Sequence, residues 1–256
     1  MSKNTILTEN RLKDIEDIII SSGKIVTASD IHKALSNKYT RSAIKKRIYD
    51  LKEKGWLIPL KRGLYFIADI TSRGFVGISP FVIANAFVKD SYISLESGLS
   101  FYNLLEQMLR TTTSITINKS IHYEFQDHTY RFLKIKNELY FGFRTIALEG
   151  RYIMMVELEK LILDFLYFKN DTYSIDLIIE KVEKIKDLLD KEKLFDYARA
   201  FPITTKRKLG FILDLFAIDN KELYKTLSKK GYSKLTSNSK TFNPKWRIYY
   251  EDRFTR

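Results

Sequence analysis

Residues 41–54 carry several side chains whose hydrogen-bond donors are of the kind that recognise nucleic acid. Arginine and lysine donate to phosphate oxygens and guanine edges, while serine and tyrosine hydroxyls add contacts to bases or the backbone. The donors are Arg41, Ser42, Lys45, Lys46, Tyr49 and Lys52. A second basic pair, Lys61 and Arg62, follows in the sequence. These residue types predict a DNA-binding surface.

The same segment has the apolar spacing of an amphipathic helix. Ile44, Ile48 and Leu51 recur at intervals of three and four residues, which places them on one helical face. Thr40 is a favourable N-cap, and Gly55 is placed to end the helix. The sequence therefore predicts a helix over residues 41–54.

A helical wheel indicates which way the donors point. With Ile44 set toward the core and about 100° of rotation per residue, Ser42, Lys46 and Tyr49 fall on the opposite side. Lys45 lies to one side, and the remaining donors lie nearer the rim. An exposed basic helix face can be merely solvated, but the independent basic pair at positions 61 and 62 favours DNA binding.

The elements that must position this helix follow from the neighbouring sequence. Apolar periodicity predicts a first helix over residues 9–22, and Thr27 with Asp30 has the spacing of a capping box for a second, short helix that ends near Asn37. After the third helix, residues 56–58 and 64–67 are strand-like around a turn at 59–63 that carries the basic pair. This order predicts a winged helix-turn-helix over residues 1–74.

The charge distribution agrees with this assignment. The chain has 256 residues and a formal net charge of +13. Residues 1–68 hold 14 Lys and Arg against 7 Asp and Glu, so more than half of the excess lies in the first quarter of the chain. A concentrated positive charge attracts a polyanion, so the N-terminal segment is the expected binding module.

The rest of the chain, residues 75–256, has mixed character and predicts an α+β fold. Strand and short helix patterns alternate in residues 75–156, helical periodicity dominates residues 157–232, and a tail follows in residues 233–256. Within the tail, Trp246, Ile248 and Tyr250 alternate as in a closing strand. The longest uncharged stretch, residues 74–88, is interrupted by proline and is too short to cross a membrane.

Several catalytic chemistries find no support in the residue types. The chain has no cysteine, which also favours a reducing compartment such as the cytoplasm, and its three histidines lack metal-ligand spacing. It has no Asp-x-Asp pair for catalytic magnesium and no glycine-rich phosphate loop. Glu157, Glu159 and Asp164 fall in a predicted helix with a strong apolar stripe, and we expect them at its solvated edge. The residues predict no cofactor, no metal and no enzyme.

Two further basic clusters lie in the C-terminal part. They are Lys206, Arg207 and Lys208, and the tail residues Lys245 and Arg247. Cations at a helix N-terminus oppose the helix dipole, so the first cluster can serve an anionic partner, although a solvated run of charge accounts for it equally well.

Several motifs along the chain resemble the AbiEi family of antitoxins and abortive-infection regulators. The resemblance lies in residues 55–57 (Gly-Trp-Leu), 61–65 (Lys-Arg-Gly-Leu-Tyr), 79–84, 92–99, 130–132, 140–142, 157–167 and 243–248. It extends over nearly the whole chain. It implies an N-terminal winged helix that represses its own operon by binding operator inverted repeats. It also implies a C-terminal domain that antagonises a nucleotidyltransferase-like toxin of a type IV toxin–antitoxin pair in bacterial phage defence.

Two other functions remain open from the sequence. One is an enzyme, such as a nuclease, that uses the winged helix for delivery. The other is a plain transcriptional repressor that senses a ligand.

Overall fold

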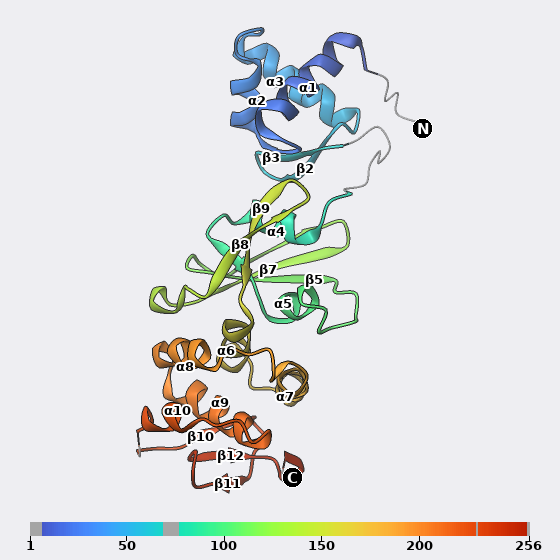
Figure 1. The fold of residues 1–256 in the computed structure, drawn as a ribbon. Helices are drawn as coiled ribbons and strands as arrows, with labels where there is room; N and C mark the ends of the chain where they lie inside the picture. Colours follow the sequence, from blue (N-terminus) through green and yellow to red (C-terminus); the bar gives the residue numbers. More distant parts are fainter. Residues whose placement is uncertain (1–6, 69–76, 229, 255–256) are drawn as a thin grey trace. The chain divides into compact units, whose positions relative to one another are not determined.

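A computed structural model describes residues 7–68, 77–228 and 230–254. The chain forms two compact units, which we call the N-terminal unit (Met1–Phe87) and the C-terminal unit (Val88–Arg256) (Figure 1). Both units combine helices with β-sheets, so the predicted α+β class is confirmed. The expected domain boundary at residues 74–75 lies outside the described residues.

The N-terminal unit begins with three helices and a small sheet. The helices are α1 (Glu9–Ser22), α2 (Ala28–Leu35) and α3 (Arg41–Glu53), and the strands are β1 (Ile25–Thr27), β2 (Leu57–Lys61) and β3 (Leu64–Ile67). The sheet is antiparallel throughout, with the order β1-β3-β2. A further helix, α4 (Pro80–Phe87), completes the unit.

Local sequence signals account for the boundaries of these helices. The Thr27 hydroxyl accepts from the Asp30 backbone N–H at 3.1 Å, and the Asp30 carboxylate accepts from the Thr27 N–H at 2.8 Å, as predicted for a capping box. The helices α1 and α3 are followed by Gly23 and Gly55, whose φ angles of 75° and 76° lie in the region that favours glycine. The apolar stripes of the three helices meet in one core with Val26, Trp56, Leu57 and Ile67.

The hairpin differs from its predicted form. We expected a turn over residues 59–63, but β2 continues to Lys61 and only Arg62 and Gly63 lie between the strands. A register shift between Pro59 and Lys61 accommodates the proline. Proline is tolerated there because β2 is an edge strand, on which a missing N–H need not break a ladder.

The C-terminal unit is built around a six-stranded mixed sheet. Its strands are β4 (Ser91–Ile93), β5 (Thr111–Thr116), β6 (Ile121–Phe125), β7 (His128–Lys134), β8 (Phe143–Leu148) and β9 (Arg151–Val156). The order is β6-β7-β5-β4-β9-β8, in which the pairs β5–β7 and β4–β9 are parallel. A 3-10 turn (Asn137–Leu139) lies between β7 and β8.

Helices and a second small sheet complete the C-terminal unit (Figure 1). The helices are α5 (Leu95–Phe101), α6 (Leu158–Phe168), α7 (Thr172–Ile185), α8 (Lys191–Ala200), α9 (Ile203–Leu215) and α10 (Lys221–Lys225). The helix α5 ends at Phe101, because Asn103 two residues later has a φ of 55° that no helix continues. The small sheet has the order β10 (Ser233–Lys234), β12 (Ile248–Tyr250) and β11 (Thr241–Asn243), and a 3-10 turn (Asp252–Phe254) follows it.

Trp246 joins the C-terminal tail to the helices. The indole is fully buried, and its N–H donates to the Asp214 carboxylate at 2.5 Å. Gly210 on α9 lies directly beneath the ring, where a Cβ atom would come within 2.0 Å of Trp246. The predicted closing strand is present as β12 for Ile248 and Tyr250, whereas Trp246 lies in the turn that precedes it. Glycine at position 210 is what lets the indole approach α9.

Candidate nucleic-acid interface

The helix α3 presents its predicted donors to solvent. The stripe Ile44, Ile48 and Leu51 is buried against the core, and the Thr40 hydroxyl caps the helix through the Ala43 N–H at 3.4 Å. The donor side chains are all exposed: Arg41, Ser42, Lys45, Lys46, Tyr49 and Lys52. We call these six residues the α3 face. Local periodicity alone was sufficient to place them on one side of the helix.

The cations of the α3 face are electrostatically free. Among the residues that the structure describes, no carboxylate forms an ion pair with Arg41, Lys45, Lys46 or Lys52. Exposed lysines commonly pair with a carboxylate one helical turn away, and α1 shows such a pair between Lys13 and Glu9 at 2.9 Å. The α3 face lacks these pairs, so its full charge is available to an anionic partner.

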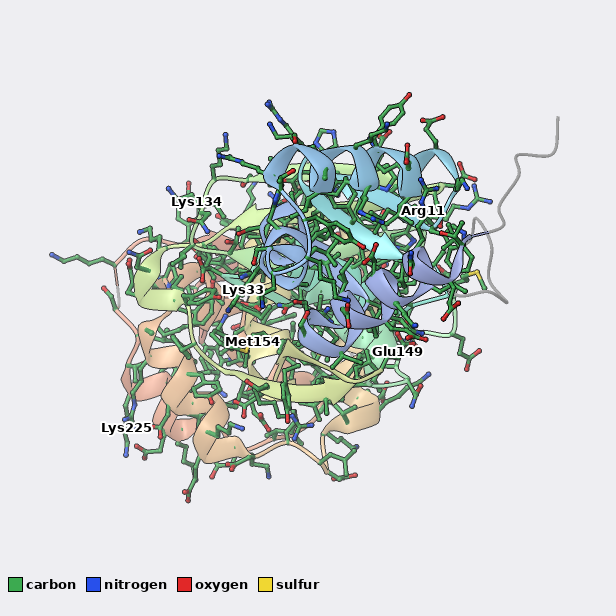
Figure 2. The ribbon with its side chains drawn as sticks, turned by 90° about the horizontal axis from the view of Figure 1, so that it is seen from above. Arg11, Lys33, Lys134, Glu149, Met154 and Lys225 are labelled. Carbon is green, nitrogen blue, oxygen red and sulfur yellow. The ribbon has the colours of Figure 1, made fainter. Side chains whose placement is uncertain are left out.

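Arg47 has a different role from its basic neighbours on α3. Its guanidinium donates to the buried carboxylate of Asp14 on α1 at 2.6 Å and lies 3.7 Å from the centre of the Tyr39 ring. Nearby, Arg11 on α1 pairs with Asp50 on α3 at 2.6 Å (Arg11 is labelled in Figure 2). These two ion pairs hold α3 on α1. Their partners are 33 and 39 positions apart in the chain, so no local sequence pattern predicts either pair.

The two basic residues of the hairpin behave differently from each other. The Lys61 ammonium is half-buried and donates to the carbonyl oxygen of Phe87 at the end of α4, at 2.5 Å. Burial lowers the pKa of Lys61. Arg62 is exposed at the turn, and no described carboxylate pairs with it. Of the pair, Arg62 is therefore the one whose charge is presented to solvent.

The predicted cluster Lys206, Arg207 and Lys208 does not form a single charged surface. Arg207 is buried and donates to the carbonyl oxygens of Ser228 and Lys230 at 3.1 and 2.7 Å. Lys208 is also buried and donates to carbonyl oxygens at the end of α6. Only Lys206 reaches the surface in part.

The tail residues Lys245 and Arg247 line a separate pocket. It has a volume of about 360 Å³ and also includes Arg207, Tyr224 and Lys225, the last of which lies at the molecular surface (Figure 2). Lys245 pairs with Asp214 at 2.7 Å, and Arg247 donates to the Gly231 carbonyl at 2.7 Å. The structure thus brings Arg207, Lys245 and Arg247 together, and leaves Lys208 facing elsewhere.

The two acidic residues of α6, Glu159 and Asp164, are buried and do not lie at a solvated edge, so that expectation is wrong for both. The Asp164 carboxylate pairs with Lys160 and accepts hydrogen bonds from the Tyr92 and Ser94 hydroxyls at 3.1 and 2.8 Å. Both charged side chains are fully buried, which raises the pKa of Asp164 and lowers that of Lys160. Their burial is possible because each charge finds its partners inside the protein.

The described residues were also compared with the requirements of a metal site and of a membrane-spanning helix. In the described ranges, no group of three or more His, Asp or Glu side chains is arranged to hold a metal ion. No helix in the described part of the chain has both the length and the apolar character needed to cross a membrane.

Comparisons with known proteins identify a solved structure with a similar fold, but they assign the chain to no family. No family model and no curated protein matches the chain. Among solved structures, the chain is similar to the crystal structure of the RV2827C protein from Mycobacterium tuberculosis, with a TM-score of 0.67. The two are 10% identical in sequence, and the match covers 96% of this chain and 92% of the other. At this identity the likeness concerns the fold, which the two chains share over nearly their full length.

Proposed function

We propose that the N-terminal unit is a winged helix-turn-helix that binds double-stranded DNA, with α3 as the recognition helix. The observation that carries this proposal is the α3 face, whose cations have no carboxylate partner among the described residues. Lys45, Lys46 and Tyr49 would contact base edges in the major groove, because the first turns of a recognition helix lie nearest the bases. Arg41, Ser42 and Lys52 would reach the phosphates on either side.

The β2–β3 hairpin would act as the wing. Its turn carries Arg62, an exposed guanidinium free of described ion pairs, which suits a phosphate contact. Lys61 was expected to share this task, but its ammonium is bound to the Phe87 carbonyl. The wing contact is therefore assigned to Arg62.

We further propose that the protein is the antitoxin and autorepressor of a bacterial type IV toxin–antitoxin operon. The support is the resemblance to the AbiEi family along the chain. In this proposal the N-terminal unit binds operator inverted repeats, and the C-terminal unit antagonises a nucleotidyltransferase-like toxin in the cytoplasm. The fully enclosed Lys160–Asp164 pair gives no substrate access, which favours this function over a nuclease using those residues.

A gel-shift titration with the promoter fragment upstream of the protein's own gene tests DNA binding. The K45A/K46A/Y49A variant should bind at least about tenfold more weakly, since each base-edge contact contributes about 1–3 kcal/mol. The K119A/K191A variant is the control, because it removes two exposed, unpaired lysines from the C-terminal unit. Equal affinity of wild type and the α3 variant would exclude α3 as the recognition helix.

Co-expression with the adjacent gene product tests the antitoxin function. Wild type and the K45A/K46A/Y49A variant should both rescue growth, while only wild type represses a promoter fusion. If neither protein rescues growth but wild type represses, the protein is a repressor without antitoxin function. Magnesium-dependent cleavage of labelled nucleic acid by the purified protein would instead indicate an enzyme.

A further inference from the structure

A pocket in the C-terminal unit combines features that suit an anionic ligand. It has a volume of about 400 Å³ and lies where the end of α6, the start of α9 and residues 234–237 meet. Its described lining includes Lys169, Lys208 and Lys234 but no aspartate or glutamate. Lys169 is neutralised by Glu96 at 2.5 Å, so Lys208 and Lys234 are the cations that remain.

The start of α9 contributes the positive end of a helix dipole. This helix has 13 residues, its N-cap is Pro202 without a side-chain cap, and its first turn holds no acidic residue. The first hydrogen bond within the helix joins the Lys206 N–H to the Pro202 carbonyl at 3.2 Å. The backbone N–H groups ahead of Lys206 therefore have no intrahelical acceptor, and Thr204 and Thr205 carry two of them to the pocket wall.

Thr205 provides an observation that is independent of the helix dipole. The residue is only 2% exposed, yet its hydroxyl makes no hydrogen bond to any described residue. Only two fully enclosed polar side-chain atoms of the described residues lack a hydrogen-bond partner, and they belong to Ser114 and Arg207. The Thr205 hydroxyl is not one of them, so it keeps some contact with open space. Because Thr205 lines the pocket, we infer that the small exposed area of this residue, and with it the hydroxyl, opens into the pocket. Buried hydroxyls are normally paired, so an unpaired one at a pocket wall points to a missing ligand.

Lys208 brings a buried ammonium to the same wall. It lies one helical turn beyond Thr205 and is 4% exposed. The ammonium donates to the Leu166 and Lys169 carbonyls at 3.3 and 2.9 Å, which leaves one of its three N–H bonds free. Within the described residues no carboxylate pairs with it. An anion in the pocket would supply the charge partner that the protein itself does not.

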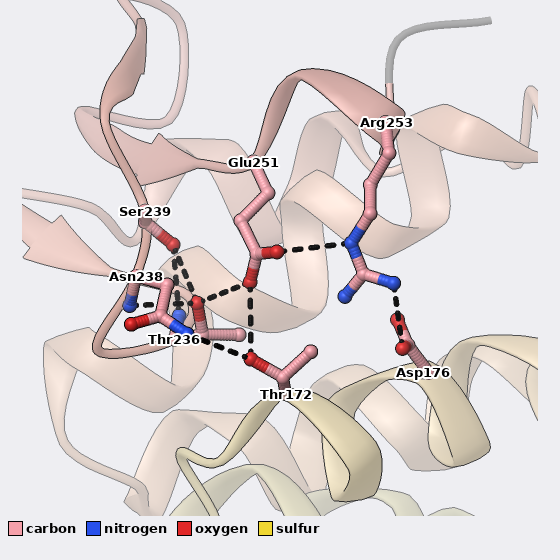
Figure 3. Close-up of polar contacts among 7 residues, drawn as sticks. All are labelled: Thr172, Asp176, Thr236, Asn238, Ser239, Glu251 and Arg253. Carbon is pink, nitrogen blue, oxygen red and sulfur yellow. Dashed lines mark hydrogen bonds and ion pairs between the residues drawn. The ribbon is translucent and has the colours of Figure 1, made fainter.

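Thr236, which also lines the pocket, belongs to a hydrogen-bond network with the C-terminal tail. Thr236 donates to the Glu251 carboxylate at 2.6 Å, and its backbone N–H donates to Ser239 at 3.0 Å (Figure 3). Arg253 pairs with the other oxygen of Glu251 at 2.9 Å and with Asp176 at 2.7 Å, so the charge of Glu251 is already satisfied. This network ties residues 236–239 to Glu251, and so anchors the segment that follows Lys234.

We propose that this pocket binds a phosphate group, either as free phosphate or as the phosphate of a small molecule such as a nucleotide. An uncapped helix N-terminus, a threonine hydroxyl and two lysines are the donors that a phosphate dianion requires. Tyr167 and Pro202 also line the pocket, and their rings offer apolar surface for the organic part of a phosphate monoester. The inference is independent of DNA binding by the N-terminal unit.

Isothermal titration of the full chain with inorganic phosphate and with AMP tests the proposal. Thr205→Val removes the free hydroxyl, and Thr205→Ser retains it. Lys234→Ala removes the exposed cation, and its matched control is Lys240→Ala, an exposed lysine outside the pocket. We expect saturable binding at one site. T205V and K234A should weaken it at least about fivefold, while T205S and K240A stay within about twofold.

The two ligands distinguish the source of the phosphate. Tighter binding of AMP than of phosphate would show that the organic part is recognised, and equal affinity would show that the phosphate group alone is bound. Absence of saturable binding of both ligands to wild type would overturn the proposal. So would affinities that do not change in K234A, whose exposed side chain can be removed without disturbing the core.

Discussion

Arg47 on α3 and Asp14 on α1 form an ion pair of 2.6 Å, in which the Asp14 residue is only 2% exposed. This pair ties the proposed recognition helix to the helix on which it rests. The Arg47 guanidinium also stacks on Tyr39, so one side chain joins α1, α3 and the segment between α2 and α3. The orientation of the α3 face therefore depends on a residue that does not belong to it.

Replacing Arg47 by alanine should destabilise the protein through Asp14. The buried carboxylate would lose its partner, and the expected cost is about 2 kcal/mol because Arg47 itself is partly solvated. Arg11→Ala is the matched control, since Arg11 pairs with Asp50 at the same distance but both side chains are more exposed. Urea unfolding should show the larger loss in R47A. Equal losses would indicate that the burial of Asp14 is unimportant.

The hairpin makes a prediction about salt dependence. Arg62→Ala should reduce the slope of log affinity against log salt concentration by about one, because one phosphate contact is lost. Lys61→Ala should leave that slope unchanged and lower the unfolding midpoint, since its ammonium binds the Phe87 carbonyl. DNA titrations at several salt concentrations measure both. A reduced slope in K61A would show that Lys61, and not only Arg62, touches the DNA backbone.

Because Lys160 and Asp164 form a buried ion pair, substitutions of the two residues should have strongly non-additive effects on the free energy of unfolding. Lys160→Met would strand a fully buried carboxylate and should cost about 3–5 kcal/mol. The K160M/D164N double variant should be more stable than K160M, because the uncompensated charge is gone. Chemical denaturation of wild type, both single variants and the double variant gives the coupling energy. Additive effects would contradict a direct interaction between the two side chains.

The buried ammonium of Lys208 should make the stability of the protein depend on pH. Comparing wild type with a variant that lacks this ammonium isolates its contribution. Burial lowers the pKa of its ammonium to about 8, against the attraction of Asp171, while the same group in the unfolded chain keeps its ordinary value of 10.5. Between these two values the unfolded state binds more protons, so this group raises the stability of the fold as the pH increases from about 8 toward 10. Below pH 8 the contribution is constant and unfavourable.

Urea unfolding of wild type and Lys208→Met at pH 7.5, 8.5 and 9.5 measures this dependence. We expect the stability of wild type relative to K208M to rise with pH, by at most about 1.4 kcal/mol per unit. Titrations of other groups cancel in the difference. A flat difference over this range would mean that the pKa of Lys208 is not lowered.

The sequence alone was enough to determine the helices of the N-terminal unit and the exposure of the α3 face. The capping pair Thr27 and Asp30, the stop at Gly55 and the stripe of Ile44, Ile48 and Leu51 all act within a few residues. Such signals are read locally, so they predict helix ends and faces without knowledge of the fold. Whether the α3 face binds DNA stays a prediction.

Only the tertiary structure decided which charged residues are buried. The sequence predicts Asp164 at a solvated helix edge, but the carboxylate is buried and accepts a hydrogen bond from Tyr92, 72 positions away in the chain. Arg207 and Lys208 form a charge run in the sequence, yet the two side chains reach different carbonyl groups 21 to 42 positions away. A charge can leave water only where the fold supplies its hydrogen-bond partners, and these come from distant segments that no local pattern reveals.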